Sequence, residues 1–128
     1  MHANCALFME DVAKRFSAHF HDVKVLEVGS NEPQGTTRGF FHNCEYLGVD
    51  RIAGPNVDLV SDINSCDFAE GSFDTVIVNS VFEHDAEWRT TLSNCIKWLK
   101  ERGICIVCFV RNKQTTGLRT SLLVVRRA

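Results

Sequence analysis

The sequence predicts an α/β fold with a doubly wound, mostly parallel sheet, and two observations carry this prediction. Short apolar runs, typical of strands that are buried on both faces, alternate with segments whose apolar residues recur at helical spacing. Several of these runs end on a glycine, an acid or an amide, as is common at the carboxyl edge of a parallel sheet. We therefore expect strands at the centre and helices on both sides.

The first element is expected to be a helix over residues 3–20, because large apolar side chains recur there every four positions. The side chains expected on its inner face are Phe8, Val12, Phe16 and Phe20, with Leu7 beside them. This stripe is most simply explained as the face that packs on the core.

Four strands are expected in the next part of the chain, where apolar runs are separated by polar segments and turns. They comprise residues 24–30, 45–50, 57–63 and 73–80. A short helix is expected within 35–42, and Gly54 and Pro55 mark a turn over 51–56.

Asp85 is expected to cap a second long helix over 86–101, and Gly103 is expected to end it. Apolar residues at helical spacing predict which side of this helix faces the core. They are Trp88, Leu92, Cys95, Ile96 and Leu99.

The last two strands are expected over 104–110 and 120–128, joined by a loop over 111–119. A crossover between parallel strands takes a dozen or more residues, so this loop predicts an antiparallel return. The predicted strand order is 3-2-1-4-5, with an antiparallel C-terminal edge strand beside the fifth.

Composition narrows the function classes. The chain is 45% hydrophobic with a net charge of −2, which favours a globular protein and gives no whole-protein attraction to nucleic acid or membranes. No apolar run reaches the roughly 18 residues of a membrane span, and charges within 1–20 argue against a signal peptide, so a cytoplasmic location is expected. One domain is expected over 1–128, with an N-terminal helix (1–20), a nucleotide-binding core (24–110) and a loop with an edge strand (111–128).

Six cysteines raise the question of disulfides or zinc. Only Cys105 and Cys108 form a Cys-x-x-Cys pair, and an offset of three in a strand places two side chains on opposite faces. A zinc knuckle needs a turn there and a second pair of ligands. We therefore expect reduced, buried thiols and no metal site.

Polar or special residues close four of the expected strands, namely Gly29, Asp50, Asp62 and Asn79. Ligands of open α/β sheets bind outside the carboxyl ends of the strands, so these residues are expected to face one site. Asp50 follows Gly29 by about 20 residues, the usual spacing for an acid that accepts hydrogen bonds from both hydroxyls of a ribose.

The segment "VLEVGSNEPQG", residues 25–35, indicates which adenosine ligand fits. A pyrophosphate needs close approach to backbone N–H groups, which Asn31 and Pro33 obstruct, and Glu27 and Glu32 would repel its charge. S-adenosylmethionine carries a sulfonium and an ammonium group instead of phosphates, so carboxylates attract it. The segment therefore favours this ligand over a dinucleotide.

Taken in order, these motifs resemble a known family, the class I S-adenosylmethionine-dependent methyltransferases. "VLEVGS", "YLGVD", "LVSDI" and "FDTVIVNSVFEH" resemble its first four motifs, and "LKERGICIVCF" resembles the helix, turn and strand that follow. The resemblance spans about residues 24–110 and implies a Rossmann-like fold, abbreviated here at the C-terminus. The glycine loop departs from the family pattern, since only Gly29 is kept of its alternating glycines.

The resemblance implies a set of residues that hold S-adenosylmethionine. They are Glu27, Gly29, Ser30, Asp50, Arg51, Asp62, Ile63, Asn79 and Ser80. In this set Glu27 would order the loop or face the ammonium group, Asp50 would hold the ribose, and Asp62 with the Ile63 N–H would read the adenine edge. No metal ligand is implied.

The function implied is methyl transfer from S-adenosylmethionine to a small-molecule acceptor. Asn79 and Ser80 would line the floor near the methyl group, and His84 is the candidate base. One alternative is a non-catalytic module of this fold that binds a partner protein; another is a nicotinamide-dependent dehydrogenase, against which the missing glycine pattern argues. A homodimer through the C-terminal strand, or a partner protein that completes the site, is also left open.

Each of these residues also has a purely structural explanation. Glu27 can cap backbone groups, Asp50 and Asp62 can be ordinary strand-end acids, and His84 can be a surface residue near a helix start. Basic residues of the C-terminal segment are explained by protection of an edge strand, with a phosphate-binding surface as the alternative. They are Arg111, Lys113, Arg119, Arg126 and Arg127.

Overall fold

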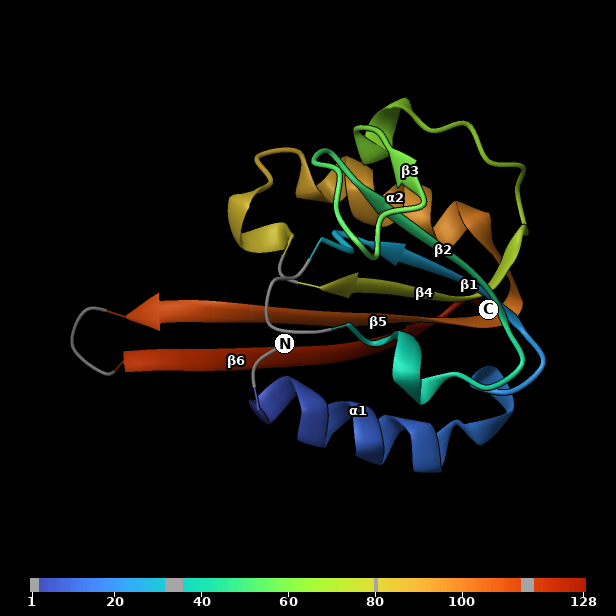
Figure 1. Ribbon diagram of the computed structural model, residues 1–128, viewed down its shortest axis with the longest axis horizontal. Helices are drawn as coiled ribbons and strands as arrows, with labels where there is room; N and C mark the ends of the chain where they lie inside the picture. Colours follow the sequence, from blue (N-terminus) through green and yellow to red (C-terminus); the bar gives the residue numbers. More distant parts are fainter. Residues whose placement is uncertain (1–2, 32–35, 80, 114–116) are drawn as a thin grey trace.

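The computed structural model describes residues 3–31, 36–79, 81–113 and 117–128. The six strands within these ranges form one sheet in the order β3-β2-β1-β4-β5-β6. Strands β1 to β5 run parallel, and β6 pairs antiparallel with β5 (Figure 1). This confirms the α/β class, the mostly parallel sheet and the predicted strand order.

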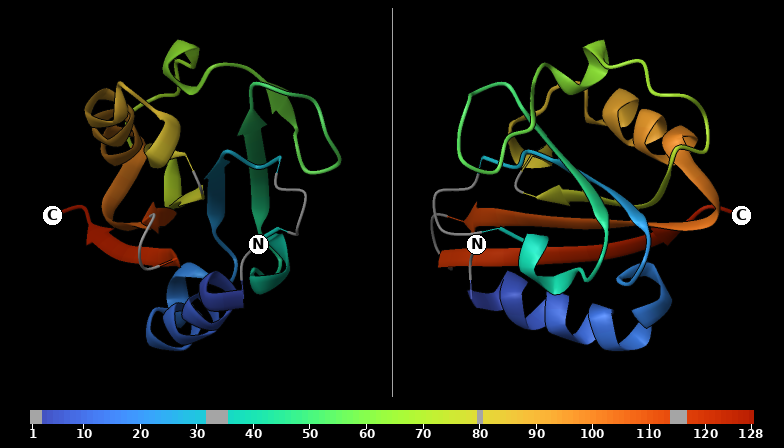
Figure 2. Two further views of the ribbon diagram at one scale, coloured as in Figure 1. Left: turned by 90° about the vertical axis from the view of Figure 1, so that its left-hand side faces the viewer. Right: turned by 45° about the vertical axis from the view of Figure 1, so that its right-hand side comes forward.

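The elements have the following bounds. The strands are β1 (Lys24–Val28), β2 (Glu45–Asp50), β3 (Leu59–Val60), β4 (Phe73–Asn79), β5 (Leu99–Lys113) and β6 (Gly117–Arg126). The helices α1 (Ala3–Arg15) and α2 (Trp88–Trp98) lie on opposite sides of the sheet (Figure 2). Short 3-10 helices are η1 (Ser17–His19), η2 (Arg38–Phe40), η3 (Ile63–Ser65) and η4 (Phe82–His84). No helix among the described residues has the length and apolar character that a membrane crossing requires.

The α1 side of the sheet carries one hydrophobic cluster. Met9 and Val12 of α1 pack there with Phe20 and with Ile77 of β4. Leu7, expected beside the inner face, is 65% exposed. The buried face of α1 is therefore rotated away from Leu7, because Met9 takes a core position that the four-residue spacing did not include.

The first helix ends earlier than the expected boundary at residue 20. The chain leaves the α-helix at Arg15 and forms η1. The Thr75 hydroxyl donates to the His19 carbonyl at 2.8 Å, and the Phe20 ring stacks on Phe41 with 4.5 Å between centroids. These long-range contacts override the helical periodicity of the sequence at this point.

The second helix also ends before its expected boundary at residue 101. After Trp98 the chain turns into β5, where Leu99 lies opposite Phe73 of β4. Gly103 therefore lies inside β5 and does not end the helix. A Cβ at Gly103 would lie within 3.0 Å of two backbone carbonyl oxygens, which explains the glycine by close packing of the chain.

The α2 side of the sheet carries a second hydrophobic cluster. Cys95 and Trp98 of α2 are buried against Val76 and Val78 of β4. Trp88, expected on the inner face, is 38% exposed, because the helix begins at this residue and its first turn projects past the core.

The third strand is much shorter than the expected range 57–63. Only the two residues of β3 pair with β2, and both are exposed at the sheet edge. The carboxylates that flank it bind backbone N–H groups: Asp58 accepts from Gly48 at 2.7 Å, and Asp62 accepts from Asn64 at 2.9 Å. These side chain–backbone bonds compete with the strand and stop it on both sides.

The C-terminal strands form a long hairpin that extends past the end of β4 (Figure 1). Its ladder runs from the pair Ile104–Arg126 to the pair Lys113–Gly117. The loop expected over 111–119 is therefore wrong in extent, because cross-strand pairing continues beyond the compact part of the sheet.

The cysteines differ from the expectation in one pair. Cys5 of α1 and Cys108 of β5 form a disulfide, with their Cα atoms 6.6 Å apart, so the prediction of six reduced thiols is wrong for these two. The sequence does not show which turn of α1 lies over which residue of β5. Cys95 and Cys105 are free and buried, and burial raises the pKa of Cys105 to about 12.

Candidate functional site

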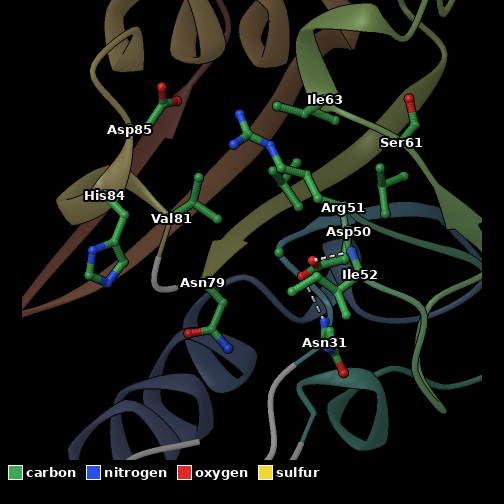
Figure 3. A pocket seen from close by; sticks show the side chains of 13 residues that line it. Asn31, Asp50, Arg51, Ile52, Ser61, Ile63, Asn79, Val81, His84 and Asp85 are labelled. Carbon is green, nitrogen blue, oxygen red and sulfur yellow. Dashed lines mark hydrogen bonds between the residues drawn. The ribbon is translucent and has the colours of Figure 1, made fainter.

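A pocket of about 380 Å³ lies at the carboxyl edge of the sheet, where β1, β2 and β4 end (Figure 3). Its volume is within the roughly 300 to 1,000 Å³ that small-molecule sites occupy. The pocket combines apolar walls with a few polar side chains. It is lined by Val28, Gly29, Asn31, Val49, Asp50, Arg51, Ile52, Ser61, Ile63, Asn79, Val81, His84 and Asp85.

Gly29 makes the turn at the end of β1, with a φ of +77°. A Cβ on this residue would overlap the Val81 side chain and would lie 3.0 Å from the Asn79 carbonyl oxygen. The Gly29 N–H donates to the Val49 carbonyl at 2.9 Å. The turn therefore requires glycine and presents bare backbone to the pocket.

Asp50 is the last residue of β2, and it lines the pocket. Its Oδ2 accepts the Asn31 N–H at 3.1 Å, and its Oδ1 accepts the Ile52 N–H at 3.1 Å (Figure 3). These bonds hold the carboxylate in place and join the turns that follow β1 and β2. Each oxygen has a second lone pair with which it can accept a ligand hydroxyl.

The chain after β3 contributes Ser61 and Ile63 to the pocket, whereas Asp62 between them does not line it. The Asp62 Oδ1 caps η3, and its Oδ2 pairs with the Arg51 guanidinium at 3.1 Å. Arg51 itself lines the pocket. The contact of Asp62 with an adenine amine stays a prediction, and in this structure Arg51 holds that carboxylate.

The end of β4 places Asn79, which is buried, on the pocket wall. His84 lies at the end of η4 as an exposed residue of the pocket rim, and Asp85 follows it. Asp85 accepts hydrogen bonds from the Glu87 N–H at 2.8 Å and from the Thr91 hydroxyl at 2.5 Å. The helix begins at Trp88 with Glu87 as its N-cap residue, two positions later than predicted, so Asp85 binds Glu87 and Thr91 from outside the helix and is not its N-cap.

Ser30 and Ser80 are the remaining predicted site residues. Ser30 is buried and does not line the pocket. Ser80 lies outside the described residues, as do Glu32, Pro33 and Gly35 of the loop.

Glu27 is fully buried, and its side chain lies on the face of the sheet that α1 covers. Neighbouring strand residues face opposite sides, and Val25 packs in the α1-side cluster, so Glu27 lies on that side and does not line the pocket. Its Oε1 accepts from the Tyr46 hydroxyl at 2.7 Å and from the Thr36 hydroxyl at 3.4 Å. Burial raises the pKa of Glu27 to about 7, although these hydrogen bonds oppose the rise.

Sequence reasoning missed seven lining residues, namely Val28, Asn31, Val49, Ile52, Ser61, Val81 and Asp85. Each stands within two positions of a predicted site residue. Residues on either side of a strand end face the same edge of the sheet, and this adjacency was the available signal. Ile52 is 66% exposed and lines the pocket, so a ligand bound there can cover its side chain.

A family model described as a methyltransferase domain matches residues 36–107, more than half of the chain. The chain belongs to this methyltransferase family, which confirms the family resemblance of its motifs. The match begins after the segment in which the glycine pattern of the sequence departs from the family. A comparison with curated protein sequences finds no significant match.

Solved structures share the fold at low identity. A 1,6-didemethyltoxoflavin-N1-methyltransferase from Burkholderia thailandensis, with S-adenosylhomocysteine bound, is 16% identical over 88% of this chain and 60% of its own, with a TM-score of 0.63. Coclaurine N-methyltransferase, bound to N-methylheliamine and S-adenosylhomocysteine, is 18% identical over 82% and 36%, with a TM-score of 0.63. The cyclase SpnF is 17% identical over 87% and 47%, with a TM-score of 0.62. The chain thus spans only 36% to 60% of the length of these structures.

Proposed function

We propose that this chain binds S-adenosylmethionine in the pocket at the carboxyl edge and transfers its methyl group to a small-molecule acceptor. The observation that carries the proposal is the Asp50 carboxylate, held at the end of β2 beside the Gly29 turn. Membership in the methyltransferase family supports the reaction class. The S-adenosylhomocysteine in two structures of similar fold supports the ligand.

The residues present fit an adenosine. Asp50 can accept hydrogen bonds from both ribose hydroxyls, because neither of its oxygens is saturated by the N–H groups that hold it. Ile52 and Ile63 provide apolar walls for a purine ring. Covering the exposed Ile52 side chain removes apolar surface from water and thereby favours binding.

The residues at the end of β1 and β4 fit the other half of the ligand. The Gly29 turn allows an extended amino-acid chain to lie against bare backbone. When bound, S-adenosylmethionine supplies a methyl carbon that is already activated by the sulfonium. The protein then has to align the acceptor and exclude water. Asn79 borders this space, and we assign to His84 on the rim the role of base for an acceptor that must lose a proton.

Calorimetric titration with S-adenosylhomocysteine tests the binding step, with NADH as the control ligand. We expect S-adenosylhomocysteine to bind and NADH to give no measurable heat. The sequence after Gly29 contains Glu32, whose negative charge would repel the pyrophosphate of NADH. A melting temperature that is unchanged by millimolar S-adenosylmethionine and S-adenosylhomocysteine would refute the proposal, since a ligand of the folded state must raise it. The alternative function, a non-catalytic module of this fold that binds a partner protein, would then be favoured.

Methyl transfer needs a separate test, because a shared fold does not fix the reaction. The structural likeness to SpnF, a cyclase, makes this point concrete. The two other structures are N-methyltransferases by name, so small molecules with a nucleophilic nitrogen are the first acceptors to assay, with donor labelled in its methyl group. Binding without transfer to any acceptor would favour the non-catalytic module.

A further inference from the structure

We propose that a second cavity, at the amino edge of the sheet, is a binding site for a free aromatic α-amino acid. In this site Glu45 binds the ammonium group of the ligand, Lys24 binds its carboxylate, and apolar side chains receive its ring. The proposal is independent of methyl transfer, because the cavity shares no lining residue with the pocket at the carboxyl edge.

The cavity has a volume of about 310 Å³ and lies where β1, β2 and β4 begin, at the opposite end of these strands from the first pocket (Figure 1). Its volume is within the range of small-molecule sites. The length of β1 separates the two pockets by about 16 Å, since each of its five residues advances the strand by about 3.3 Å. A ligand in the cavity therefore cannot accept a methyl group in the other pocket. The lining includes Lys24, Glu45, Leu47, Phe68, Ser72 and Phe73.

Three of these side chains, Leu47, Phe68 and Phe73, give the cavity an apolar wall. All three pack in the hydrophobic cluster on the α2 side of the sheet. Phe68 contacts Phe73 and Trp98 edge to face, with ring centroids 5.2 Å and 5.0 Å apart, and these contacts orient its ring. Phe68 is still only partly buried. An aromatic ring in the cavity covers this apolar surface and adds to ring contacts that are already formed.

Two opposite charges lie on the rim of the same cavity. Lys24 and Glu45 are the first residues of β1 and β2, and they are partners in the parallel ladder. Side chains alternate along a strand, and Leu26 and Leu47, two positions further on, both pack on the α2 side. The Lys24 and Glu45 side chains therefore lie on the same face of the sheet as the apolar wall, and both are exposed.

Lys24 and Glu45 do not neutralise each other. Among the described residues, no ion pair includes either side chain. The Lys24 ammonium lies instead 5.4 Å from the centroid of the Phe73 ring. The nearby Asp74 accepts the Lys24 backbone N–H at 2.9 Å, and its carboxylate pairs with the Lys100 ammonium at 3.2 Å.

The pair of charges selects a zwitterion. An α-amino acid carries its ammonium and its carboxylate on one carbon, so a single small ligand presents both charges to neighbouring strands. A ligand with a carboxylate alone would be repelled by Glu45, and a ligand with an amine alone would be repelled by Lys24. Charge and apolar surface together therefore favour an aromatic amino acid over a simple aromatic acid or amine.

An NMR titration with L-phenylalanine tests the site. The amide signals of Lys24, Glu45 and Ser72 should shift with a dissociation constant of about 1 mM, because a ligand of this size makes few contacts. The signals of Gly29 and Asp50 in the other pocket should not move. No shift at ten times this concentration, or shifts confined to Gly29 and Asp50, would overturn the proposal.

Two analogues of phenylalanine test the need for both charges. The first, 3-phenylpropanoate, lacks the ammonium group, and the second, 2-phenylethylamine, lacks the carboxylate. Each should bind the wild type about two- to tenfold more weakly than phenylalanine, because one exposed ion pair is lost and one like charge remains. If either analogue binds as tightly as phenylalanine, the site does not recognise a zwitterion and the proposal fails.

Glu45→Gln and Lys24→Gln decide which side chain binds which group. Glu45→Gln should weaken phenylalanine and strengthen 3-phenylpropanoate, whose carboxylate it no longer repels. Lys24→Gln should weaken phenylalanine and strengthen 2-phenylethylamine for the matching reason. A merely structural role would shift the affinities of all three ligands in the same direction, and that result contradicts the proposal.

Glu101→Gln and Lys97→Gln are the matched controls, because each removes one exposed charge outside the cavity. Both should leave the three affinities unchanged, and a loss equal to that of the cavity variants would reduce the effect to net charge and overturn the assignment. None of these titrations contains S-adenosylmethionine or its product. Failure of the proposed function and failure of this site are therefore observed separately.

Discussion

The N–H of Asn31 donates to the Asp50 carboxylate at 3.1 Å and thereby joins the turn after β1 to the end of β2 (Figure 3). The same carboxylate accepts the Ile52 N–H. Asp50 is therefore both part of the pocket wall and the group that holds two of its loops. A variant at Asp50 therefore changes both the pocket wall and the attachment of these two loops. Its control must be another carboxylate that accepts a backbone N–H but does not line the pocket.

Asp50→Ala should weaken binding of S-adenosylhomocysteine by about ten- to a hundredfold, because hydrogen bonds to a charged group contribute roughly 1.5 to 3 kcal/mol. Asp74→Ala is the matched control, since Asp74 also accepts a backbone N–H, that of Lys24 at 2.9 Å, and does not line the pocket. It should cost stability and leave the affinity unchanged. Calorimetry measures both, and equal affinities of the two variants would remove Asp50 from the ribose site.

Gly29→Ala should destabilise the protein by about 2 to 4 kcal/mol in urea unfolding. A left-handed backbone costs an ordinary residue roughly 1 to 2 kcal/mol, and the overlap with Val81 adds a packing cost of similar size. Gly39→Ala is the control, because a Cβ there meets nothing within 4 Å. Adding Val81→Ala to Gly29→Ala should recover part of the loss. A loss below about 0.5 kcal/mol in Gly29→Ala would show that the turn is not built as described.

Asp62 should contribute to recognition of the adenine amine only when its carboxylate is released from Arg51. Arg51→Ala should therefore increase the preference for S-adenosylhomocysteine over S-inosylhomocysteine, whose ring carries a carbonyl in place of the amine. Asp62→Ala should reduce the same preference. The effects should stay within about tenfold, because an exposed ion pair contributes roughly 1 kcal/mol or less. If neither variant changes the ratio of the two affinities, Asp62 does not contact the adenine amine.

The sheet could be predicted because β1 and β4 at its centre are almost entirely buried and β2 is partly buried. β1, β2 and β4 appear in the sequence as short apolar runs that end on Gly29, Asp50 and Asn79. The edge strand β3 could not be predicted in length, because the carboxylates of Asp58 and Asp62 bind backbone N–H groups that a longer strand would use. The helix ends depend on distant partners such as Thr75, which no local pattern reveals.

The site could be predicted only in part, for a related reason. Residues at strand ends share one edge of a parallel sheet, so Asp50 and Asn79 meet at the pocket whatever the loops do. Which face a strand residue takes can also be read from alternation, and this reasoning would have placed Glu27 on the α1 side. Loop residues such as Asn31 and Ile52 follow no period, so only the structure assigns them.

Glu27→Gln should change how stability depends on pH. Folding raises the pKa of Glu27 from 4.5 to about 7, so the folded state binds this proton more tightly than the unfolded state. Stability from this group is complete below pH 4.5 and is lost as the pH rises to 7, by up to about 3 kcal/mol. The variant has no such loss, so its stability relative to the wild type should rise between pH 5 and pH 8.5. Urea unfolding at both values measures the difference, in which contributions of the shared groups cancel. Parallel stability curves would mean that the carboxylate is better solvated than its complete burial implies.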